Sequence, residues 1–331
     1  MASKPRATGA DAVVLFGKEV TYATPPDGSA GGVYVRPPLK TSELSGSQPL
    51  EDDQLWNTGS SEDTDPSLGA FDASGDITAP LDSRGAGFWL TAALGAEPAA
   101  PVHDADAGTY LHTWQSGEDI SSYTVQTGHP KLTTPKWKTA KGAKAGGFSF
   151  QLARNGRAIL TLPMIAQSEA KDTPANPRDA APLVYDYLPF DNATGSVKVN
   201  GTQLASLTGG TITYSSTPEA IETIRPDMFI DGIDEGIRTL SGSFDLRLGT
   251  DHTIDDLVDG GTSCAVEVSF TLRSQPTWKF VLTMPRVFFE RSKQPIDGPG
   301  GIQITTNWRA AKDATAGYML QVTLLNDVAA Y

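Results

Sequence analysis

Two stretches of the chain alternate apolar and polar residues in the same order. The first runs from Ser74 to Leu81, the second runs from Ser241 to Leu248, and both begin with Ser-Gly. An alternation with a period of two is typical of a strand that has one buried face and one face in water. The sequence therefore predicts two half-buried strands of the same type.

Each predicted strand leads into a short helical segment, over residues 88–95 in the first stretch and 254–261 in the second. Superposing Ser74 on Ser241 also places Leu81 on Leu248, so the apolar faces of the two strands coincide. A chance similarity would not keep order, spacing and face together. We interpret the two stretches as copies of one unit.

The similarity continues beyond these stretches. Five further features of the first copy have a counterpart in the second. Residues 123–125 match 278–281, Pro130 matches Pro285, Gly146-Gly147 matches Gly300-Gly301, residues 148–152 match 302–306, and residues 158–165 match 318–325. The sequence thus predicts a mainly β protein with two tandem domains, residues 1–170 and 183–331, joined by a proline-containing linker at 171–182.

Four further segments are interpreted from composition and spacing. They are a long irregular loop at 23–70, an insertion at 96–119 interpreted as a surface loop anchored by Tyr110, His112 and Trp114, a basic loop at 131–144, and a helix at 218–224. A long irregular segment in a compact domain is usually disordered or built to reach a neighbour.

Composition limits the class of protein. The 331 residues are 39% hydrophobic and 20% charged, and no apolar run approaches the roughly 20 residues that cross a bilayer. The apolar patch near the N-terminus is too short for a signal peptide, so we expect a soluble protein that stays where it is made. The single cysteine, Cys264, excludes an intrachain disulfide and a thiolate metal cluster, and its apolar neighbours predict a buried side chain.

Charge is unevenly distributed. The net charge of −13 argues against a basic surface that wraps nucleic acid, yet residues 41–83 hold ten acids and no Lys or Arg, and residues 120–168 hold seven Lys or Arg and no acid. The lysines of the basic loop have three interpretations: binding of phosphate or stacking on a base, a solvated loop, or contact with the acidic segment of another subunit. These lysines are Lys131, Lys136, Lys138, Lys141 and Lys144.

The sequence contains no recognisable catalytic, cofactor-binding or metal-binding pattern. The four histidines fall in different predicted loops, and neither a phosphate-binding glycine loop nor a dinucleotide fingerprint is present. Asp104 and Asp106 lack the spacing of a calcium loop. We therefore predict no catalytic residues, no metal site and no cofactor.

The unit from Leu68 to Gly95 resembles the tail tube proteins of long-tailed, siphovirus-like bacteriophages. Those proteins commonly have a long acidic loop, a strand that begins Ser-Gly, and a short helix that closes on Ala-Ala-Leu-Gly, here residues 92–95. The second unit matches more loosely because it ends in Asp259-Gly260-Gly261.

The resemblance implies a β-sandwich or barrel domain with a short flanking helix, six of which close a ring with a continuous inner β-barrel. Stacked rings form the tube through which the genome leaves. With a duplicated domain, three chains would close a ring of pseudo-sixfold symmetry, which would also remove exposed strand edges. The implied protein is a structural, non-enzymatic part of the virion that is assembled in the host cytoplasm, away from membranes. Its partners would be itself, the tape measure, tail terminator and tail tip proteins, and double-stranded DNA that passes without specific binding.

Two sets of residues are candidates for function in such a tube. The polar strand faces predict lumen-lining positions at Asp76, Thr78, Ser149, Gln151, Ser243, Asp245, Gln303 and Thr305, although these positions would also suit outer solvent. Contacts between stacked rings are predicted for the segment 23–70 and for the N-terminal arm, residues 1–10. The candidate contact residues are Glu51, Asp52, Asp53, Glu62, Asp63, Asp65, Lys131, Lys136, Lys138, Lys141 and Lys144.

Two other classes of function stay open on the sequence. A capsid decoration or host-binding β-sandwich module would also be a two-domain β protein without catalytic residues. A carbohydrate-active enzyme would need a cleft with paired carboxylates, whereas the acids here crowd into one irregular segment.

Overall fold

A computed structural model describes residues 6–52, 62, 64–249, 253–294, 296 and 298–331. The fold is mainly β, as predicted, with two short α-helices, α1 (Ala86–Leu94) and α2 (Thr253–Asp259), and two 3₁₀ helices, η1 (Gly9–Asp11) and η2 (Asn192–Thr194). No helix among the described residues is long and apolar enough to cross a membrane. The strands are β1 (Val13–Lys18), β2 (Tyr34–Val35), β3 (Thr41–Ser42), β4 (Ser45–Ser47), β5 (Leu50–Glu51), β6 (Ser67–Leu68), β7 (Asp72–Pro80), β8 (Val102–Asp104), β9 (Thr109–Gln115), β10 (Tyr123–His129), β11 (Lys136–Ala145), β12 (Gly147–Leu152), β13 (Ile159–Ile165), β14 (Ser168–Lys171), β15 (Gly195–Val199), β16 (Thr202–Gln203), β17 (Leu207–Ser215), β18 (Glu219–Ile221), β19 (Gly232–Asp234), β20 (Thr239–Arg247), β21 (Cys264–Thr271), β22 (Lys279–Phe289), β23 (Gln303–Ala310) and β24 (Gln321–Asn326).

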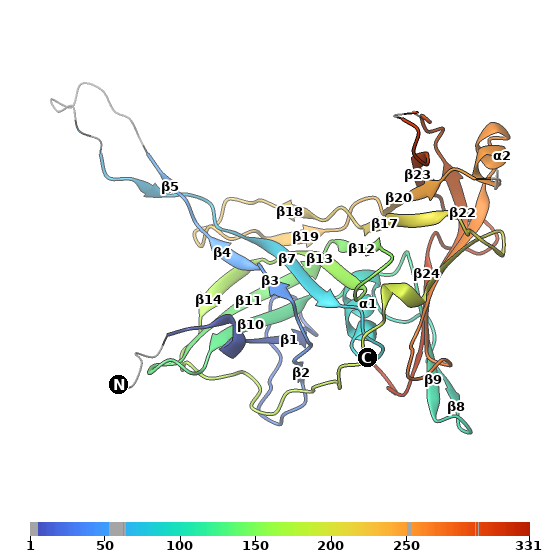
Figure 1. The fold of residues 1–331 in the computed structure, drawn as a ribbon. Coiled ribbons are helices and arrows are strands. Elements are labelled where there is room, and N and C mark those ends of the chain that lie inside the picture. The colour runs from blue at the N-terminus through green and yellow to red at the C-terminus, as the bar shows by residue number, and fades with distance from the viewer. Residues whose placement is uncertain (1–5, 53–61, 63, 250–252, 295, 297) are drawn as a thin grey trace.

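A central sheet runs through both halves of the chain (Figure 1). Its six strands are antiparallel and lie in the order β7, β13, β12, β17, β20, β23. Within this sheet, β12 of the first half lies next to β17 of the second half. The two strands pair from Gly147 opposite Ser215 to Leu152 opposite Gly210. Backbone hydrogen bonding therefore continues across the junction of the two halves.

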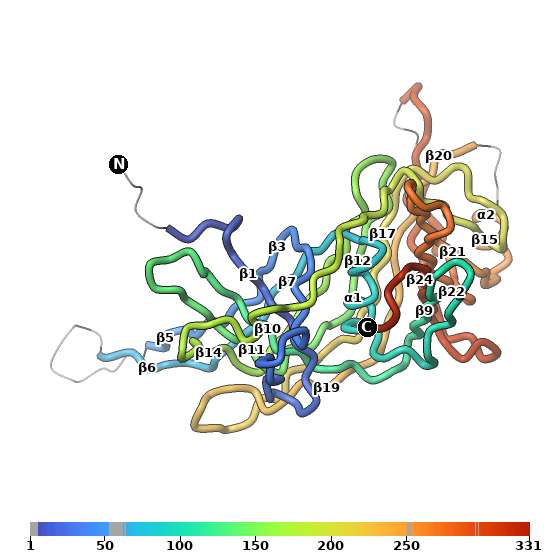
Figure 2. Tube along the Cα trace, turned by 90° about the horizontal axis from the view of Figure 1, so that it is seen from below, coloured from blue at the N-terminus to red at the C-terminus, as the bar shows by residue number. Residues whose placement is uncertain are grey.

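Two flanking sheets pack on the apolar side of the central sheet, one in each half (Figure 2). The first flanking sheet has the order β2, β1, β10, β11, β14, and the second has the order β16, β15, β21, β22, β24, β9, β8. A single buried cluster of apolar side chains extends through both halves. The two halves thus share one core as well as one sheet.

The two helices differ in burial because they differ in sequence. Every residue of α1 is buried, as expected for a helix that is apolar all round, and its Phe88 and Trp89 rings pack against Phe16. In α2 only Ile254 is buried, and the first turn carries Asp255. The two predicted helical segments are therefore confirmed, but only the first is a core helix.

The strand pairing of the first half is repeated in the second. β10 pairs with β11, β11 with β13 and β14, and β13 with β7; in the same way β21 pairs with β22, β22 with β23 and β24, and β23 with β20. The β10–β11 ladder shifts register after Tyr123, and the β21–β22 ladder shifts after Cys264. This repeated pairing supports the predicted duplication. It also changes the predicted matches, because β23 corresponds to β13 by its partners, whereas the sequence comparison matched it to residues 148–152.

The insertion at 96–119 is not the surface loop that the sequence predicts. Its β8–β9 hairpin adds two strands to the second flanking sheet, with Thr113 of β9 opposite Thr323 of β24. Trp114 and His112 are fully buried, which confirms their predicted anchoring role. The hairpin therefore ties the first half of the chain to the second.

Two other local predictions were wrong. The predicted basic loop at 131–144 is a strand over most of its length, β11, because its lysines alternate with the buried residues Trp137 and Thr139. The predicted helix at 218–224 is instead the strand β18, whose Ala220 pairs with Ile233 of β19. In both segments tertiary pairing overrides the local sequence signal.

The predicted linker, 171–182, is fastened to the first half. The Asp179 carboxylate accepts hydrogen bonds from the backbone N–H groups of Val33 and Tyr34, each at 3.0 Å, and the Arg178 guanidinium donates to Asp172 at 3.0 Å. Burial opposes ionisation of Asp179, but hydrogen bonds from the backbone N–H groups of Tyr34, Ala181 and Val33 hold the pKa of its carboxyl group below the usual range. The segment is a fixed connection in this structure.

Candidate functional site: a polar sheet face and two hairpins

All eight predicted lumen-lining residues lie on one face of the central sheet. Residues directly opposite each other in a ladder share a face, and one row across the six strands runs Thr78, Thr161, Ser149, Thr213, Ser241, Arg309. Asp76, Gln151, Ser243, Asp245, Gln303 and Thr305 fall on the same side by the period of two. The structure therefore brings together, on one surface, side chains from both halves of the chain.

Hydroxyl groups dominate this polar face. The Thr211 and Ser243 hydroxyls lie 3.0 Å apart, and the Thr305 hydroxyl donates to the Asp245 carboxylate at 2.6 Å. Among the six strands, the ionisable residues on this side are Asp72, Asp76, Asp245, Arg247 and Arg309. The face is thus close to neutral and carries no cluster of cations.

The opposite face of the same sheet is apolar and buried. Ile77, Phe148, Ile212 and Phe244 are each at most 1% exposed. Because strand residues alternate between faces, burying this side fixes the polar side outward, and a register slip of one residue would reverse both. The apolar core therefore determines which side chains form the polar face.

The predicted acidic contacts lie on an arm that projects from the sheet (Figure 1). β4 leads into β5, where Leu50 pairs with Leu68 of β6, and Glu51, Asp52, Glu62 and Asp65 are exposed along it. Asp53 and Asp63 lie outside the described residues. The arm extends well beyond the central and flanking sheets (Figure 1).

A second hairpin, β18–β19, leaves the central sheet at the same end. β4 runs antiparallel to β7, and the β5–β6 hairpin between them leaves the sheet where β7 begins. In the same way β17 runs antiparallel to β20, and the β18–β19 hairpin leaves where β20 begins. The second hairpin also carries acids, including Glu219, Glu222 and Asp234. Sequence reasoning missed it because a helix was assigned there, although Gly232 and Gly236 after residues 219–221 were a possible signal for a strand and turn.

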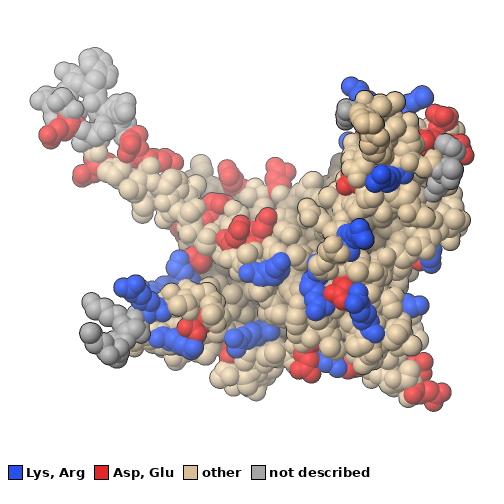
Figure 3. Space-filling view, viewed as in Figure 1, with Lys and Arg blue, Asp and Glu red and all other residues tan. Residues whose placement is uncertain are grey.

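The five predicted lysine contacts are placed on or next to β11. Three have carboxylate partners within the chain: Lys131 pairs with Asp11, Lys138 with Glu169 at 2.9 Å, and Lys144 with Glu235 at 3.5 Å. Lys136 is exposed and Lys141 is half-buried, and neither has an ion pair among the described residues. Figure 3 shows acids along the arm and cations gathered below it, over the ends of β10 and β11.

His112 and Cys264 are both buried in the structure. The His112 ring nitrogens lie 2.8 Å from Glu97 and 2.8 Å from the Val328 carbonyl oxygen, and burial raises the pKa of the Cys264 thiol to about 11. Within the described part of the chain, no three His, Cys, Asp or Glu side chains are grouped so that they could hold a metal ion.

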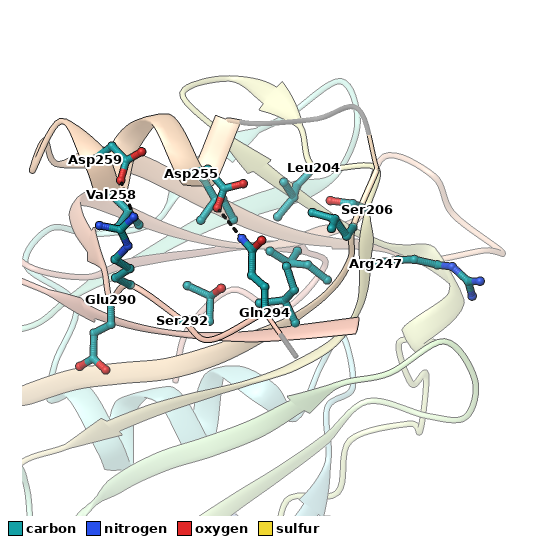
Figure 4. Close-up of a pocket in the computed structure, with 15 residues that line it drawn as sticks. Leu204, Ser206, Arg247, Asp255, Val258, Asp259, Glu290, Ser292 and Gln294 are labelled. Carbon is teal, nitrogen blue, oxygen red and sulfur yellow. Dashed lines mark hydrogen bonds and ion pairs between the residues drawn. The ribbon is translucent and has the colours of Figure 1, made fainter. Parts of the chain in front are cut away.

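A cavity of about 380 Å³ lies between α2 and the central sheet in the second half (Figure 4). Its lining includes Ile254 and Val258 of α2, Leu248 at the end of β20, and the residues Asp259 and Glu290. In the first half, the aromatic residues Phe148 and Phe150 of β12 are buried in the core, and α1 contacts β12. Between β22 and β23, none of the described residues belongs to a strand.

No curated protein matches the chain. The family model described as phage tail tube protein matches residues 9–310, which include the central sheet, both helices and both projecting hairpins. With that match over most of its length, the chain belongs to the phage tail tube protein family.

Proposed function

We propose that three copies of this chain close a ring of pseudo-sixfold symmetry, and that stacked rings form the conduit for DNA. The observation that carries the proposal is the central sheet, in which the halves join edge to edge through β12 and β17. Two similar domains joined in this way span one third of a six-domain ring. Repeating the same junction between copies closes the sheet into a barrel and pairs its remaining edges.

The edges available for closure can be named from the internal repeat. Ser45 lies opposite Ser74 as Thr213 lies opposite Ser241, so the outer edge of β3–β4 corresponds to β17. The segment after β22 corresponds to β12. Ala143 of β11 and Val287 of β22 are equivalent, because each lies opposite the residue at which its ladder shifts register, and the sixth residue after each is Ser149 or Lys293. Ring closure would therefore pair Lys293 of one copy with Ser45 of the next, and the residues after β22 would become a strand.

In such a ring the polar face lines the lumen. Duplex DNA carries one negative charge per about 1.7 Å of axis, and a basic wall would hold it by counterion release. Hydroxyl and amide groups with few charges provide no such attraction. The near-neutral face around Ser149, Thr211 and Ser243 therefore suits a pipe through which DNA slides.

Ring stacking is assigned to the two hairpins. Both leave the same end of the central sheet, so a closed ring of three chains carries six of them on one rim. Their acids, together with Lys136 and Lys141 of β11, would meet the opposite rim of the next ring or a neighbouring subunit. Tape measure, terminator and tip proteins would use the same rims at the ends of the tube.

The mass of the smallest closed assembly tests the ring, and cysteine cross-linking tests its closure. In a Cys264→Ala background, Ser45→Cys with Lys293→Cys should give covalent dimers and trimers on oxidation, because directly opposed strand residues place their Cβ atoms at nearly disulfide distance. The matched control is Ser149→Cys with Thr213→Cys, which should close within one chain and stay monomeric.

Three chains in the closed ring and a cross-linked series that ends at three would support the proposal. A ring of six chains would refute the pseudo-sixfold arrangement. Discrete monomers at high concentration would refute the tube itself and favour a decoration or host-binding module.

A further inference from the structure

Phe190 lies between the ends of two strands of the central sheet. Its N–H donates to the Leu81 carbonyl oxygen at 2.9 Å, and its own carbonyl oxygen accepts from the Ala158 N–H at 3.0 Å. The Leu81 N–H donates to the Ala158 carbonyl oxygen at 2.9 Å. The segment that precedes the second half thus closes the end of β7 and β13 in the first half.

The corresponding place in the second half is open. The Leu248 N–H donates to the Ile302 carbonyl oxygen at 3.0 Å, as Leu81 does to Ala158. Among the described residues, however, neither the Leu248 carbonyl oxygen nor the Ile302 N–H has a backbone partner. Leu248 is 37% exposed, whereas Leu81 is 1% exposed. A notch is therefore left at the end of β20, beside the cavity of Figure 4.

The internal repeat identifies the segment that fits this notch. η2 precedes β15 and η1 precedes β1, and the two strands have matching registers, with Val199 opposite Val266 and Phe16 opposite Val125. Aligning Phe16 with Val199 places η1 on η2. Ala7 then takes the place of Phe190, because each lies two residues before its 3₁₀ helix.

Ala7 cannot reach the notch of its own chain. In both views, η1 at the blue end of the chain lies on one side of the molecule and α2 lies on the opposite side (Figures 1 and 2). Arg6, Ala7 and Thr8 are exposed in the single chain. The occupant must therefore be a second copy.

We propose that residues 6–8 of one copy dock in the notch between Leu248 and Ile302 of the next copy, as residues 189–191 dock in the first half. The Ala7 N–H donates to the Leu248 carbonyl oxygen, and the Ala7 carbonyl oxygen accepts from the Ile302 N–H. The inference rests on the proposed ring, in which the first half of each copy follows the second half of another.

The charge around the notch is mixed. The N-terminal segment is basic, with Lys4 and Arg6 and no acid before Asp11. The cavity beside the notch is lined by Asp255, Asp259 and Glu290 and also by Arg247 and Arg291, with Arg291 paired to Asp259 at 3.8 Å. The docking therefore rests on the open backbone groups of Leu248 and Ile302 and on the internal repeat. The N-terminal arm is thus assigned to contacts within a ring, whereas the sequence suggested contacts between rings.

Cross-linking between copies tests the docking. Asp191 is bridged to Arg157, so the corresponding pair is Thr8 with Gly301. In a Cys264→Ala background, Thr8→Cys with Gly301→Cys should form disulfides between copies in assembled rings. The Arg247 guanidinium next to Gly301 is the end of a flexible side chain and can move aside. Asp191→Cys with Arg157→Cys should close within the chain and serves as the matched control.

A second variant removes the proposed donor. Ala7→Pro eliminates one backbone N–H at each contact and should raise the protein concentration needed for half assembly roughly tenfold, while Ala2→Pro should leave it unchanged. Tubes that contain only monomeric Thr8→Cys, Gly301→Cys chains would overturn the docking and leave the proposed function standing. Absence of any ring would overturn both.

Discussion

Gly242 lies so close to Thr211 that a methyl group on it would come within 2.0 Å of the Thr211 carbonyl oxygen. Gly75 has the same relationship to Glu43, whose carbonyl oxygen would be 2.3 Å from the added atom. Both glycines follow the serine of the repeated Ser-Gly pair, and both face the backbone of a neighbouring segment, which is β17 for Gly242 and the residues between β3 and β4 for Gly75. The repeated Ser-Gly is thus explained by the close approach of a backbone that admits no side chain.

Replacing Gly242 by alanine should therefore destabilise the fold. Gly242→Ala forces β17 and the Trp308 ring away from β20, at a cost of about 1–3 kcal/mol in the free energy of unfolding. Urea unfolding measures the change. Gly9→Ala is the control, since a Cβ at Gly9 meets nothing within 4 Å. Equal effects of the two changes would contradict the packing argument.

The sequence predicted the parts of the fold whose signal is local. Alternation placed Ile77 and Phe244 in the core and Asp76 and Asp245 on the other side, and the apolar run from Phe88 predicted a short helix. The parts that failed depend on distant partners. β18 is a strand because Ile233 lies opposite Ala220, and no local pattern in residues 218–224 contains that information.

The polar face could likewise be predicted only as far as local alternation assigns each residue to a face of its own strand. Ser149 and Ser243 could each be assigned to a polar strand face, but their common surface depends on β12 pairing with β17. That pairing joins residues far apart in the sequence. The notch at Leu248 and the place of Ala7 emerge only when the two halves are compared by their registers.

Asp82 should make stability depend on pH. Burial raises the pKa of its carboxyl group to about 6, against opposing hydrogen bonds from the Gly85 and Arg84 N–H groups. An unfolded aspartate titrates near pH 4, so the folded protein holds a proton that the unfolded chain has lost between about pH 4 and 6. The stabilising contribution of the protonated group is complete below pH 4 and is lost as the pH rises through 6.

The variant Asp82→Asn should consequently melt at a higher temperature than the parent at pH 8, with a difference that shrinks towards pH 4.5. The asparagine oxygen can still accept from Arg84 and Gly85. Thermal unfolding at the two pH values measures the effect. Asp104→Asn replaces an exposed carboxylate that also accepts backbone N–H groups and should not reproduce this trend. A constant difference at both pH values would show that Asp82 does not titrate as described.

Trp114 should be essential for the union of the two halves. It comes from the inserted hairpin, is fully buried, and donates from Nε1 to the Thr91 hydroxyl of α1 at 3.1 Å. Trp114→Ala should lower the free energy of unfolding by about 3–5 kcal/mol, because it leaves a large cavity. Leu111→Ala, on the same strand but 39% exposed, should cost far less. Denaturant unfolding would contradict the assignment if the two variants were equally stable.

Lys136 and Lys141 should matter for assembly more than for folding. Neither has an ion pair among the described residues, so reversing both to glutamate removes cations that are available to another subunit. Tube formation, followed by electron microscopy, should be impaired most at low salt, where exposed charges are least screened. Lys279→Glu, at an exposed position of β22, is the control. Unchanged tubes at low salt would dismiss a role for these lysines.

A basic lumen should slow the passage of DNA. Ser149→Lys, Thr211→Lys and Ser243→Lys place three cations per chain on the polar face, and each cation that contacts a phosphate strengthens binding through counterion release. Virions that carry the triple variant should release their DNA more slowly, and added salt should restore the rate. Ser196→Lys, Ser269→Lys and Thr271→Lys make the matched control, since these residues alternate with the buried side chains of β15 and β21 and add the same charge on the flanking sheet. Slower release from the control virions as well would attribute the effect to net charge, and an unchanged rate in the first variant would remove the polar face from the path of the DNA.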